Sequence, residues 1–422
     1  MIKRSLLREL KSHLSKKEMS LIVGPRQAGK TTLMLMLKDF LGKSGKKTVF
    51  LNLDIENEKQ FFVSQSDLLK KIELEIGKKE GFVFIDEIQR KENAGLFLKG
   101  LYDMNLPYKF IVSGSGSIEL KEKIHESLAG RKRIFELSTL SFEEFANFKT
   151  GYKYEDRLLD FFAIETDKSR GILEEYLSFG GYPRVVLEET AAEKQKMIGE
   201  IYQSYLEKDI SYLLKVQKTE SFSKLVRIMA SQAGSLVNLS ELSATLGISV
   251  KTVKDYLWYL EKTFVLQKLT PFFVNFRKEI TKSPKYYFYD LGLRNYAIGN
   301  LGLRNNSSDE GFLFENFILN ILKERTRNGL VKINFWRTKD GAEVDFIIST
   351  GTKQIPIEIK YKEFKKPELT RSLRGFIEKY QPREAFVFNL ALEKTESLGK
   401  TKVHYIPFYK ILKLSEYLKV GN

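Results

Sequence analysis

The stretch LIVGPRQAGKTTLMLML, residues 21–37, decides the fold of the first part of this chain. It opens with the apolar run Leu21-Ile22-Val23, which predicts a buried strand, and closes with apolar residues from Leu33 to Leu37, which predict a helix. Between them lies a loop with the spacing G-x-x-x-x-G-K-[ST]. A chance Gly-Lys-Thr in a turn would lack the flanking strand and helix, so we interpret the loop as a phosphate-binding loop.

The residue types of this loop suit the binding of ATP. Gly24 and Gly29 allow the backbone to curl so that its N–H groups point at an anion, and the following helix presents its positive end there. Lys30 is expected to reach the β- and γ-phosphates, and Thr31 to supply a hydroxyl group for Mg²⁺. The predicted nucleotide contacts are Gly24, Pro25, Arg26, Gln27, Ala28, Gly29, Lys30, Thr31 and Thr32.

An acidic pair, Asp86-Glu87, follows the apolar run that begins at Gly81. Apolar residues that run straight into two acids predict a strand buried on both faces, with carboxylates at its C-terminal end. Ligands bind at that end in open parallel sheets. We therefore expect Asp86 to hold Mg²⁺, directly or through water, and Glu87 to orient and deprotonate the attacking water.

Two later segments offer further catalytic candidates. The apolar run 109–112 ends in Ser113-Gly114-Ser115, where a hydroxyl group could sense the γ-phosphate. Ser113 is the first choice and Ser115 the alternative, while a plain Ser/Gly turn would also explain the sequence. Arg131 precedes the strand predicted over 134–137, and it is a candidate transition-state arginine, delivered within the chain or from a neighbouring subunit. A surface or structural role for Arg131 is the alternative.

The combination GPRQAGKTTL, FIDEIQR, SGSGS and LAGR with LSFEEF resembles a family of archaeal and bacterial AAA+-like ATPases. Later segments, YLSFGGYPRVV, YQSYLEKDI and YDLGLRN, are similar to the same family in the same order, so the resemblance covers nearly the whole chain. It implies a P-loop ATPase core that hydrolyses ATP with Mg²⁺. It also implies downstream winged-helix and nuclease-like parts of unknown function.

Composition limits the class of protein. A chain of 422 residues is too long for one ordinary core, so about two to four domains are expected. Hydrophobic residues make up 42% and aromatic residues 13%, as in globular proteins. The absence of cysteine excludes disulfides and thiolate metal sites. We expect a cytoplasmic protein, because no secretory leader and no membrane-spanning apolar stretch are recognisable.

Charge points to a polyanionic partner. The formal net charge is +16 and the isoelectric point is near 9.4, which favours nucleic acid, most simply DNA. Basic faces that are merely solvated would give the same balance. A homo-oligomer or a protein partner also fits, and an Arg131 that acted from a neighbouring subunit would require one.

The middle of the chain divides into two helical regions. Residues 140–215 read as a helical lid, broken by Gly180-Gly181-Tyr182-Pro183, in which Arg184 and Asp209 are candidate couplers or simply structural. Residues 220–275 read as a short helix, a glycine turn at Gly247 and a longer helix, which resembles a winged helix. The expected DNA-facing residues are Lys251, Thr252, Lys254 and Tyr259 on the recognition helix, and Arg277, Lys278 and Lys282 near the wing; a structural role for this module is the alternative.

The C-terminal part carries a possible second site. A helix with Glu315 precedes a strand with Asp345 and a strand that reads Glu358-x-Lys360. Alternate residues of a strand share one face, so two carboxylates could hold Mg²⁺ while the lysine steadies the attacking water or the leaving oxygen. This order resembles the PD-(D/E)XK nuclease fold, with Glu315, Asp345, Glu358 and Lys360 as its carried-over positions. A binding-only domain or a charged surface hairpin is the alternative.

Together these features predict an α/β protein. A P-loop core with a parallel sheet flanked by helices is expected over 1–140, a helical lid over 141–217, a winged helix over 218–290 and a restriction-endonuclease-like domain over 291–422. The predicted function is Mg²⁺-dependent ATP hydrolysis that acts on DNA or is controlled by it, with metal-dependent DNA cleavage as a further hypothesis. The rival interpretations are a nucleotide-dependent switch that binds a partner without catalysis, and a protein–protein scaffold.

Overall fold

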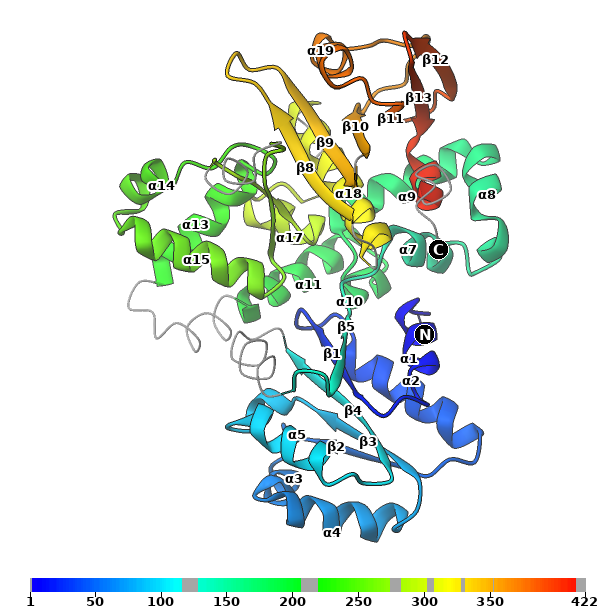
Figure 1. Ribbon diagram of the computed structural model, residues 1–422, viewed down its shortest axis with the longest axis vertical. Coiled ribbons are helices and arrows are strands. Elements are labelled where there is room, and N and C mark those ends of the chain that lie inside the picture. The colour runs from blue at the N-terminus through cyan, green and yellow to red at the C-terminus, as the bar shows by residue number, and fades with distance from the viewer. Residues whose placement is uncertain are drawn as a thin grey trace.

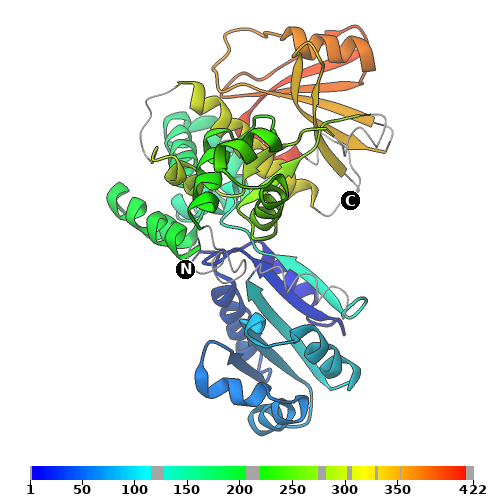
Figure 2. The ribbon, with the colours of Figure 1, turned by 90° about the vertical axis from the view of Figure 1, so that its left-hand side faces the viewer.

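The computed structural model describes residues 2–115, 128–205, 219–273, 282–301, 307–327, 331–351 and 353–414. Its two large sheets lie toward opposite ends of the long axis, with helices between them (Figure 1). The view turned by 90° shows the same separation (Figure 2). No helix in these ranges is both long enough and apolar enough to cross a membrane.

The N-terminal sheet is wholly parallel, with the strand order β2-β3-β4-β1-β5. Every residue of β1 and β3 is buried, which is why both read as continuous apolar runs. The strands are β1 (Met19–Gly24), β2 (Thr48–Asn52), β3 (Gly81–Asp86), β4 (Tyr108–Ser115) and β5 (Lys132–Glu136).

Helices cover both faces of this sheet. Ile22 and Phe84 pack with α1 and α2 on one face, while Leu21 and Val83 pack with α4 and α5 on the other. The predicted parallel sheet flanked by helices is therefore confirmed. The helical segments are α1 (Leu6–Ser12), α2 (Lys30–Lys43), α3 (Glu56–Lys59), η1 (Gln60–Phe62), α4 (Gln65–Ile76), η2 (Ile88–Arg90) and α5 (Ala94–Asp103).

A run of helices follows the sheet. Its break at Gly180-Gly181 is required by close packing: a Cβ atom on Gly180 would lie 2.2 Å from Asp290 Oδ1, and one on Gly181 would lie 2.3 Å from the Leu140 carbonyl. Gly180 also has φ +71°, which favours glycine. The segments are α7 (Phe142–Lys149), η3 (Glu155–Arg157), α8 (Leu158–Ile164), α9 (Thr166–Phe179), α10 (Pro183–Leu187) and α11 (Ala191–Ser204).

The helix-turn-helix pattern is present between α14 and α15. Asn238 caps α14 and Ser249 caps α15, while Gly247 adopts the left-handed conformation between them with φ +63°. A two-stranded antiparallel hairpin follows. The elements are α13 (Thr219–Ser231), α14 (Leu239–Leu246), α15 (Val250–Lys262), β6 (Leu266–Leu269) and β7 (Lys285–Phe288).

The apolar segments 265–269 and 286–289, which the sequence predicts as the strands of the wing, pair as the hairpin of β6 and β7, but this hairpin is buried between two cores. Tyr286 and Phe288 of β7 belong to the core of the α13–α15 helices, while Tyr287 belongs to the C-terminal core. After β6 the chain continues along β8, where the Phe335 amide donates to the Thr270 carbonyl over 3.2 Å. Alternate side chains of one strand thus join two parts of the molecule.

The C-terminal sheet is mixed, with the order β12-β13-β11-β10-β9-β8. Strands β8, β9 and β10 are antiparallel neighbours, and β10, β11 and β13 are parallel. Helix α18 packs on one face and α19 on the other. The segments are α17 (Leu291–Ala297), α18 (Ser307–Thr326), β8 (Val331–Arg337), β9 (Glu343–Thr350), β10 (Lys353–Ile359), α19 (Arg371–Tyr380), β11 (Glu384–Asn389), β12 (Lys394–Leu398), β13 (Thr401–Pro407) and η5 (Phe408–Lys413).

Candidate functional site

The phosphate-binding loop joins the C-terminal end of β1 to the first turn of α2. Gly24 has no room for a side chain, because a Cβ atom there would lie 2.0 Å from the carbonyl oxygen of Leu137. Gly29 precedes α2 with φ +93°, a left-handed conformation that favours glycine. Both glycines of the motif are therefore required by the backbone that they form.

Lys30 lies across this loop. Its Nζ donates hydrogen bonds to the carbonyl oxygens of Gly24 at 3.1 Å and Pro25 at 2.8 Å, and the residue is only 5% exposed. The ammonium group is thereby held at the loop, close to where the backbone of a phosphate-binding loop receives an anion.

Asp86 is the centre of a buried hydrogen-bond network. Thr31 Oγ1 donates to Asp86 Oδ2 at 2.6 Å, and Ser113 Oγ donates to Asp86 Oδ1. The Glu87 amide also donates to Asp86 Oδ1, at 3.1 Å. The predicted pairing of a Thr31 hydroxyl with an Asp86 carboxylate is thus present in the geometry, and both groups are hard oxygen ligands of the kind that suits Mg²⁺.

Ser113 has a different environment from the one expected. It is fully buried behind Asp86, and it does not line the cavity in front of the loop. Its hydroxyl group donates to the Asp86 carboxylate, and its predicted role toward the γ-phosphate stays a prediction. The alternative residue, Ser115, ends β4, and its side chain lies outside the described part of the structure.

Glu87 has a left-handed backbone conformation, with φ 57° and ψ 41°, which is uncommon for a residue other than glycine. Its side chain lines the cavity and accepts a hydrogen bond from the Gln89 side-chain amide. Such backbone conformations concentrate at functional sites. The sequence analysis did not identify Gln89, although its position two residues after Glu87 was visible.

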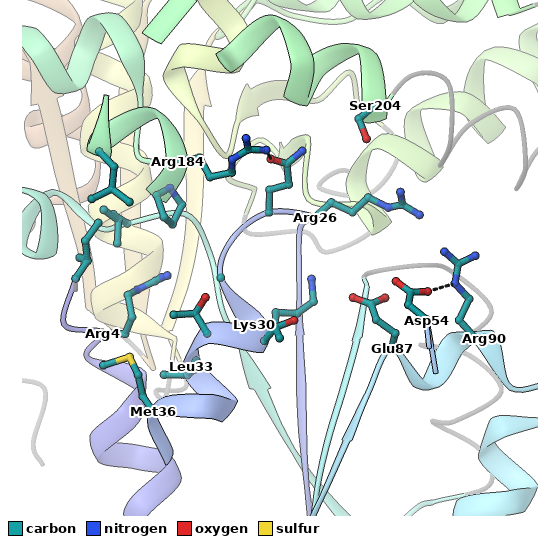
Figure 3. Close-up of a pocket in the computed structure, with 18 residues that line it drawn as sticks. Arg4, Arg26, Lys30, Leu33, Met36, Asp54, Glu87, Arg90, Arg184 and Ser204 are labelled. Carbon is teal, nitrogen blue, oxygen red and sulfur yellow. Dashed lines mark hydrogen bonds and ion pairs between the residues drawn. The ribbon is translucent and has the colours of Figure 1, made fainter. Parts of the chain in front are cut away.

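A cavity of about 520 Å³ opens in front of the loop (Figure 3). Lys30 lies between Arg4 on one side and Glu87 on the other in this view, and Arg90 donates to Asp54 Oδ1 at 2.8 Å. Helix α10 closes part of the cavity, where Arg184 donates to Gln27 Oε1 at 3.2 Å. The lining residues are Ile2, Arg4, Arg26, Gln27, Gly29, Lys30, Thr31, Thr32, Leu33, Met36, Asp54, Glu87, Arg90, Leu140, Pro183, Arg184, Leu187 and Ser204.

Arg4 is a site residue that the sequence analysis missed. Its guanidinium group donates to the Ala28 carbonyl at 2.8 Å, to the Ser138 carbonyl at 2.7 Å and to Glu144 Oε2 at 3.0 Å. Only 7% of its side chain is exposed. Arg4 therefore fastens the loop to the start of α7, and no local motif in the sequence signals such a role.

Arg131 lies beside the N-terminal end of β1, whereas the phosphate-binding loop follows the C-terminal end of that strand. The amide of Met19, the first residue of β1, donates to the Arg131 carbonyl at 2.9 Å, whereas the loop follows Gly24, the last residue of β1. Six residues of strand separate these ends by about 17 Å. Arg131 pairs with Asp103 at 2.8 Å, so within one chain it does not face the cavity.

The C-terminal candidates lie together on α18, β9 and β10. Lys360 Nζ is 2.8 Å from Glu358 Oε1, and Asp345 Oδ2 accepts a hydrogen bond from the Ile359 amide at 2.6 Å. Burial raises the pKa of Asp345 well above its ordinary value, and the charges of Glu315 and Glu358 raise it further. The structure therefore brings Glu315, Asp345, Glu358 and Lys360 into one cluster.

Three more residues belong to this C-terminal cluster, and the sequence analysis missed them. Lys285 of β7 pairs with Glu343 of β9 and lies 3.8 Å from Glu315 Oε1. The Tyr287 hydroxyl group donates to the same oxygen of Glu315. Burial opposes the charge of Lys285, but Glu315 and Glu343 outweigh it and raise its pKa.

The fit to a metal ion differs between the two regions. Thr31 and Asp86 place two oxygens together beside the cavity, which fits a Mg²⁺ ion that keeps several waters. In the C-terminal cluster, by contrast, the carboxylates do not converge: over the described ranges, no three Asp, Glu, His or Cys side chains are arranged to hold one ion. The C-terminal residues therefore do not fit a metal site in this conformation.

The residues expected to face DNA are only partly on the surface. Lys251 and Lys254 of α15 are exposed, and so is Lys282, while Thr252 and Tyr259 are half-buried. Arg277, Lys278 and Asp209 lie outside the described residues. The recognition helix thus presents lysines to solvent, but the hairpin beside it is packed against the C-terminal sheet.

Comparison with protein families divides the chain into three matched parts. A family described as an AAA domain matches residues 16–146, which include the whole parallel sheet. Two domains of unknown function match the rest: DUF8612 over residues 170–306 and DUF4143 over residues 310–411. The N-terminal part is thus similar to AAA-type ATPase domains, as predicted, and no comparison identifies the C-terminal sheet as a restriction-endonuclease-like fold.

Relatives from bacteria and an archaeon match over most of the chain. An uncharacterized protein of Mycobacterium tuberculosis is 29% identical over 384 residues, which are 88% of this chain and 76% of the relative. An uncharacterized protein of Haemophilus influenzae is 25% identical and covers 81% of this chain and 82% of the relative. One from Methanocaldococcus jannaschii is 25% identical, with 84% and 77% covered.

Solved structures superpose on this chain with low TM-scores. The replication initiator DnaA bound to AMPPCP and single-stranded DNA has a TM-score of 0.28 at 16% identity, and the overlap covers 62% of this chain and 90% of that one. The Drosophila ORC bound to DNA has a TM-score of 0.30 at 12% identity, with 70% and 95% covered. TM-scores this low do not establish a shared overall fold.

Proposed function

We propose that this chain is a Mg²⁺-dependent ATPase whose nucleotide site is the cavity in front of the loop. One observation carries the proposal: Lys30, Thr31 and Glu87 line the same cavity of about 520 Å³, and Asp86 lies directly behind Thr31. This volume lies within the range typical of small-molecule sites. Leu140, Leu187 and other apolar residues of the lining would supply contacts for the nucleoside.

Each polar residue has a distinct task in this proposal. Lys30 and the loop amides bind the β- and γ-phosphates, and Thr31 with Asp86 would hold Mg²⁺, which neutralises phosphate charge when it is bound. Glu87 accepts a proton from water while the water oxygen bonds to the γ-phosphorus. The bond between that phosphorus and the β–γ bridging oxygen breaks, and ADP and inorganic phosphate are released.

Glu87 can act as a general base only if its carboxylate is oriented toward the attacking water. The Gln89 side-chain amide, which donates to the Glu87 carboxylate, restrains the Glu87 side chain. A base that is oriented by a neighbour is typical of hydrolytic sites, and the hydrogen bond can be exchanged for one to water when nucleotide binds.

DNA is the partner that the charge of the chain favours. The net charge is +16, and Lys251 and Lys254 are exposed on the second helix of a helix-turn-helix. Two rivals remain: a nucleotide-dependent switch with very slow turnover, and a scaffold whose helices serve only protein contacts. Binding to DNA that weakens steeply with salt would favour phosphate contacts over the scaffold.

Metal-dependent DNA cleavage by the C-terminal part is a second candidate function. The element order α18, β8, β9, β10, α19, β11 and the juxtaposition of Asp345, Glu358 and Lys360 support it. Because the carboxylates do not converge on one point, the site would have to rearrange before it could take up a metal ion.

The decisive test measures ATP turnover with and without DNA and examines the same DNA on a gel. We expect turnover that requires Mg²⁺ and falls by on the order of 100-fold or more in Lys30→Ala, because the phosphates lose their only lysine ligand from the loop. Stimulation by DNA would favour action on DNA, and turnover near zero with nucleotide-dependent DNA affinity would favour the switch. Wild-type turnover in Lys30→Ala would contradict the assignment.

A further inference from the structure

The C-terminal cluster is composite, because it draws residues from two parts of the fold. Helix α18 supplies Glu315, β9 supplies Glu343 and Asp345, and β10 supplies Glu358 and Lys360. Strand β7, which pairs with β6 and packs on the α13–α15 helices, supplies Lys285 and Tyr287. Lys285 and Tyr287 therefore reach the acids only while β7 is docked.

Lys285 is the deepest cation of this cluster. Only 3% of its side chain is exposed, and it pairs with Glu343 while lying 3.8 Å from Glu315 Oε1. A buried ammonium group needs such carboxylate partners, because removal from water is costly. Arg337 adds a hydrogen bond of 2.6 Å to the other oxygen of Glu343.

One carboxylate oxygen of the same cluster, Glu358 Oε2, has no hydrogen-bond partner. Glu358 is 4% exposed, its Oε1 pairs with Lys360, and its Oε2 is buried without a hydrogen-bond partner. Buried carboxylate oxygens normally have a partner, so this oxygen can accept a hydrogen bond or ligate an ion. Its charge is felt by Asp345 on the neighbouring strand.

The positions of the two lysines explain why the carboxylates of the C-terminal cluster do not point at one common metal position. Glu315 and Glu343 face the Lys285 ammonium group, whereas Glu358 faces Lys360. Buried Lys285 and partly exposed Lys360 thus divide the carboxylates between them, and no three remain for one ion among the residues that the structure describes. The arrangement differs from the Thr31–Asp86 pair, which opens onto a cavity.

We propose that Lys285 is a built-in cation that competes with a divalent metal ion for the C-terminal cluster. The inference rests on the proposed metal-dependent function of that cluster and assigns its regulation. While β7 is docked, Lys285 pairs with Glu343 and lies beside Glu315, and the affinity of the cluster for Mg²⁺ or Mn²⁺ is lowered. When the ammonium group leaves, its two carboxylates become available beside Asp345 and the unsatisfied oxygen of Glu358.

The winged-helix hairpin is the element that would move Lys285. Lys285 and Tyr286 are neighbours on β7, and Tyr286 lies in the core of the α13–α15 helices. A shift of these helices on DNA would therefore be transmitted along one strand to the acids. This makes metal uptake conditional on the state of the helix-turn-helix.

The test is a Mn²⁺ titration of the full chain, without nucleotide, at pH 8, followed by electron paramagnetic resonance. All proteins carry Asp86→Asn so that the first site does not contribute. We expect Lys285→Met to bind Mn²⁺ on the order of tenfold more tightly than its parent, because a positive charge close to the carboxylates has been removed. Lys285→Arg keeps that charge and should behave as the parent.

Two controls make the result specific. Adding Asp345→Asn to Lys285→Met should abolish the gain, which locates the ion at the C-terminal cluster. Lys194→Met removes a comparably buried lysine that pairs with Glu175 on other helices, and it should leave Mn²⁺ binding unchanged. Lys285→Gln, which keeps a donor for Glu343, serves as the second variant if Lys285→Met does not fold by circular dichroism.

The outcomes separate the two proposals. Equal Mn²⁺ affinity in the parent and Lys285→Met, abolished in both by Asp345→Asn, would overturn the role of Lys285 and leave the metal site standing. No Mn²⁺ binding by any folded variant would overturn the metal site and, with it, this inference. A gain in Lys285→Met that Asp345→Asn does not remove would place the ion elsewhere and would also overturn it.

Discussion

Two buried cations, Arg4 and Lys285, stand beside the two candidate sites in opposite ways. Arg4 adjoins the phosphate-binding loop and donates to the main-chain carbonyls of Ala28 and Ser138 and to Glu144. Lys285 lies among the carboxylates of the C-terminal cluster and pairs with Glu315 and Glu343 themselves. Arg4 thus holds the backbone of the phosphate-binding loop in place, whereas Lys285 pairs with the carboxylates that a metal ion would need.

A cluster of suitable residues binds a ligand only where those residues face an accessible space. At the loop, Lys30, Thr31 and Glu87 face a cavity of about 520 Å³ that can receive a ligand. In the C-terminal cluster the charges satisfy one another, apart from Glu358 Oε2. The two cations should therefore have opposite effects: removing Arg4 should weaken ligand binding, whereas removing Lys285 should strengthen it.

Arg4→Met tests whether Arg4 supports nucleotide binding. We expect the affinity for ATP to fall about ten- to a hundredfold, because the Ala28 carbonyl loses a charged donor and the buried Glu144 loses its pairing with the Arg4 guanidinium group. The measurement is isothermal titration of a non-hydrolysable ATP analogue. Arg4→Lys should recover part of the affinity, since an ammonium group can replace some of the donors.

Arg294→Met is a matched control for that variant. Arg294 is also a buried arginine, 3% exposed, and it donates to the Ala230 carbonyl at 2.8 Å and pairs with Asp309. Its loss should lower thermal stability without changing nucleotide affinity. If Arg4→Met also bound the analogue as tightly as the wild type, the supporting role of Arg4 would be wrong.

A smaller effect, on the pH dependence of stability, is expected at Glu324 of α18, whose carboxyl group interacts with Glu144 of α7. Burial raises its pKa to about 7, and Glu144 and Glu143 raise it while Arg325 lowers it. The folded state thus holds this proton more tightly than the unfolded state, whose pKa is near 4.5. The stabilising contribution is complete below about pH 4.5 and is lost as the pH rises through about 7.

Glu324→Gln should remove this pH dependence. At pH 8 we expect the variant to be more stable than the wild type by about 1–2 kcal/mol, whereas near pH 4 the two should differ little. Urea unfolding at several pH values measures the difference, with Glu378→Gln, at an exposed position of α19, as the control. A stability difference that does not change with pH would contradict the explanation.

Much of the nucleotide site could be predicted from the sequence, because its groups are close together along the chain. Gly24 to Thr31 form one loop, and Asp86-Glu87 end an apolar strand whose neighbour in the sheet is set by parallel topology. The juxtaposition of Asp345 with Glu358 was predictable for a similar reason, since their strands are joined by a short turn.

The rest depends on contacts between distant segments. Arg4 and Glu144 are 140 residues apart, and Lys285 reaches Glu343 across 58 residues. Neither hydrophobic periodicity nor a local sequence motif predicts contacts between residues so far apart in the chain. The burial of the predicted wing has the same physical reason: the segments 265–269 and 286–289 do pair as a hairpin, yet the two faces of β7 are covered by different cores, which are built from distant segments.

The most direct test of the central claim compares nucleotide binding with hydrolysis in Glu87→Gln. Glu87 lines the cavity but is proposed to act only on water, so the variant should bind ATP with nearly wild-type affinity. Its rate of phosphate release should be on the order of 100-fold lower, because the general base is lost. Phosphate release by Glu87→Gln at the wild-type rate would contradict the claim that this cavity is a hydrolytic site.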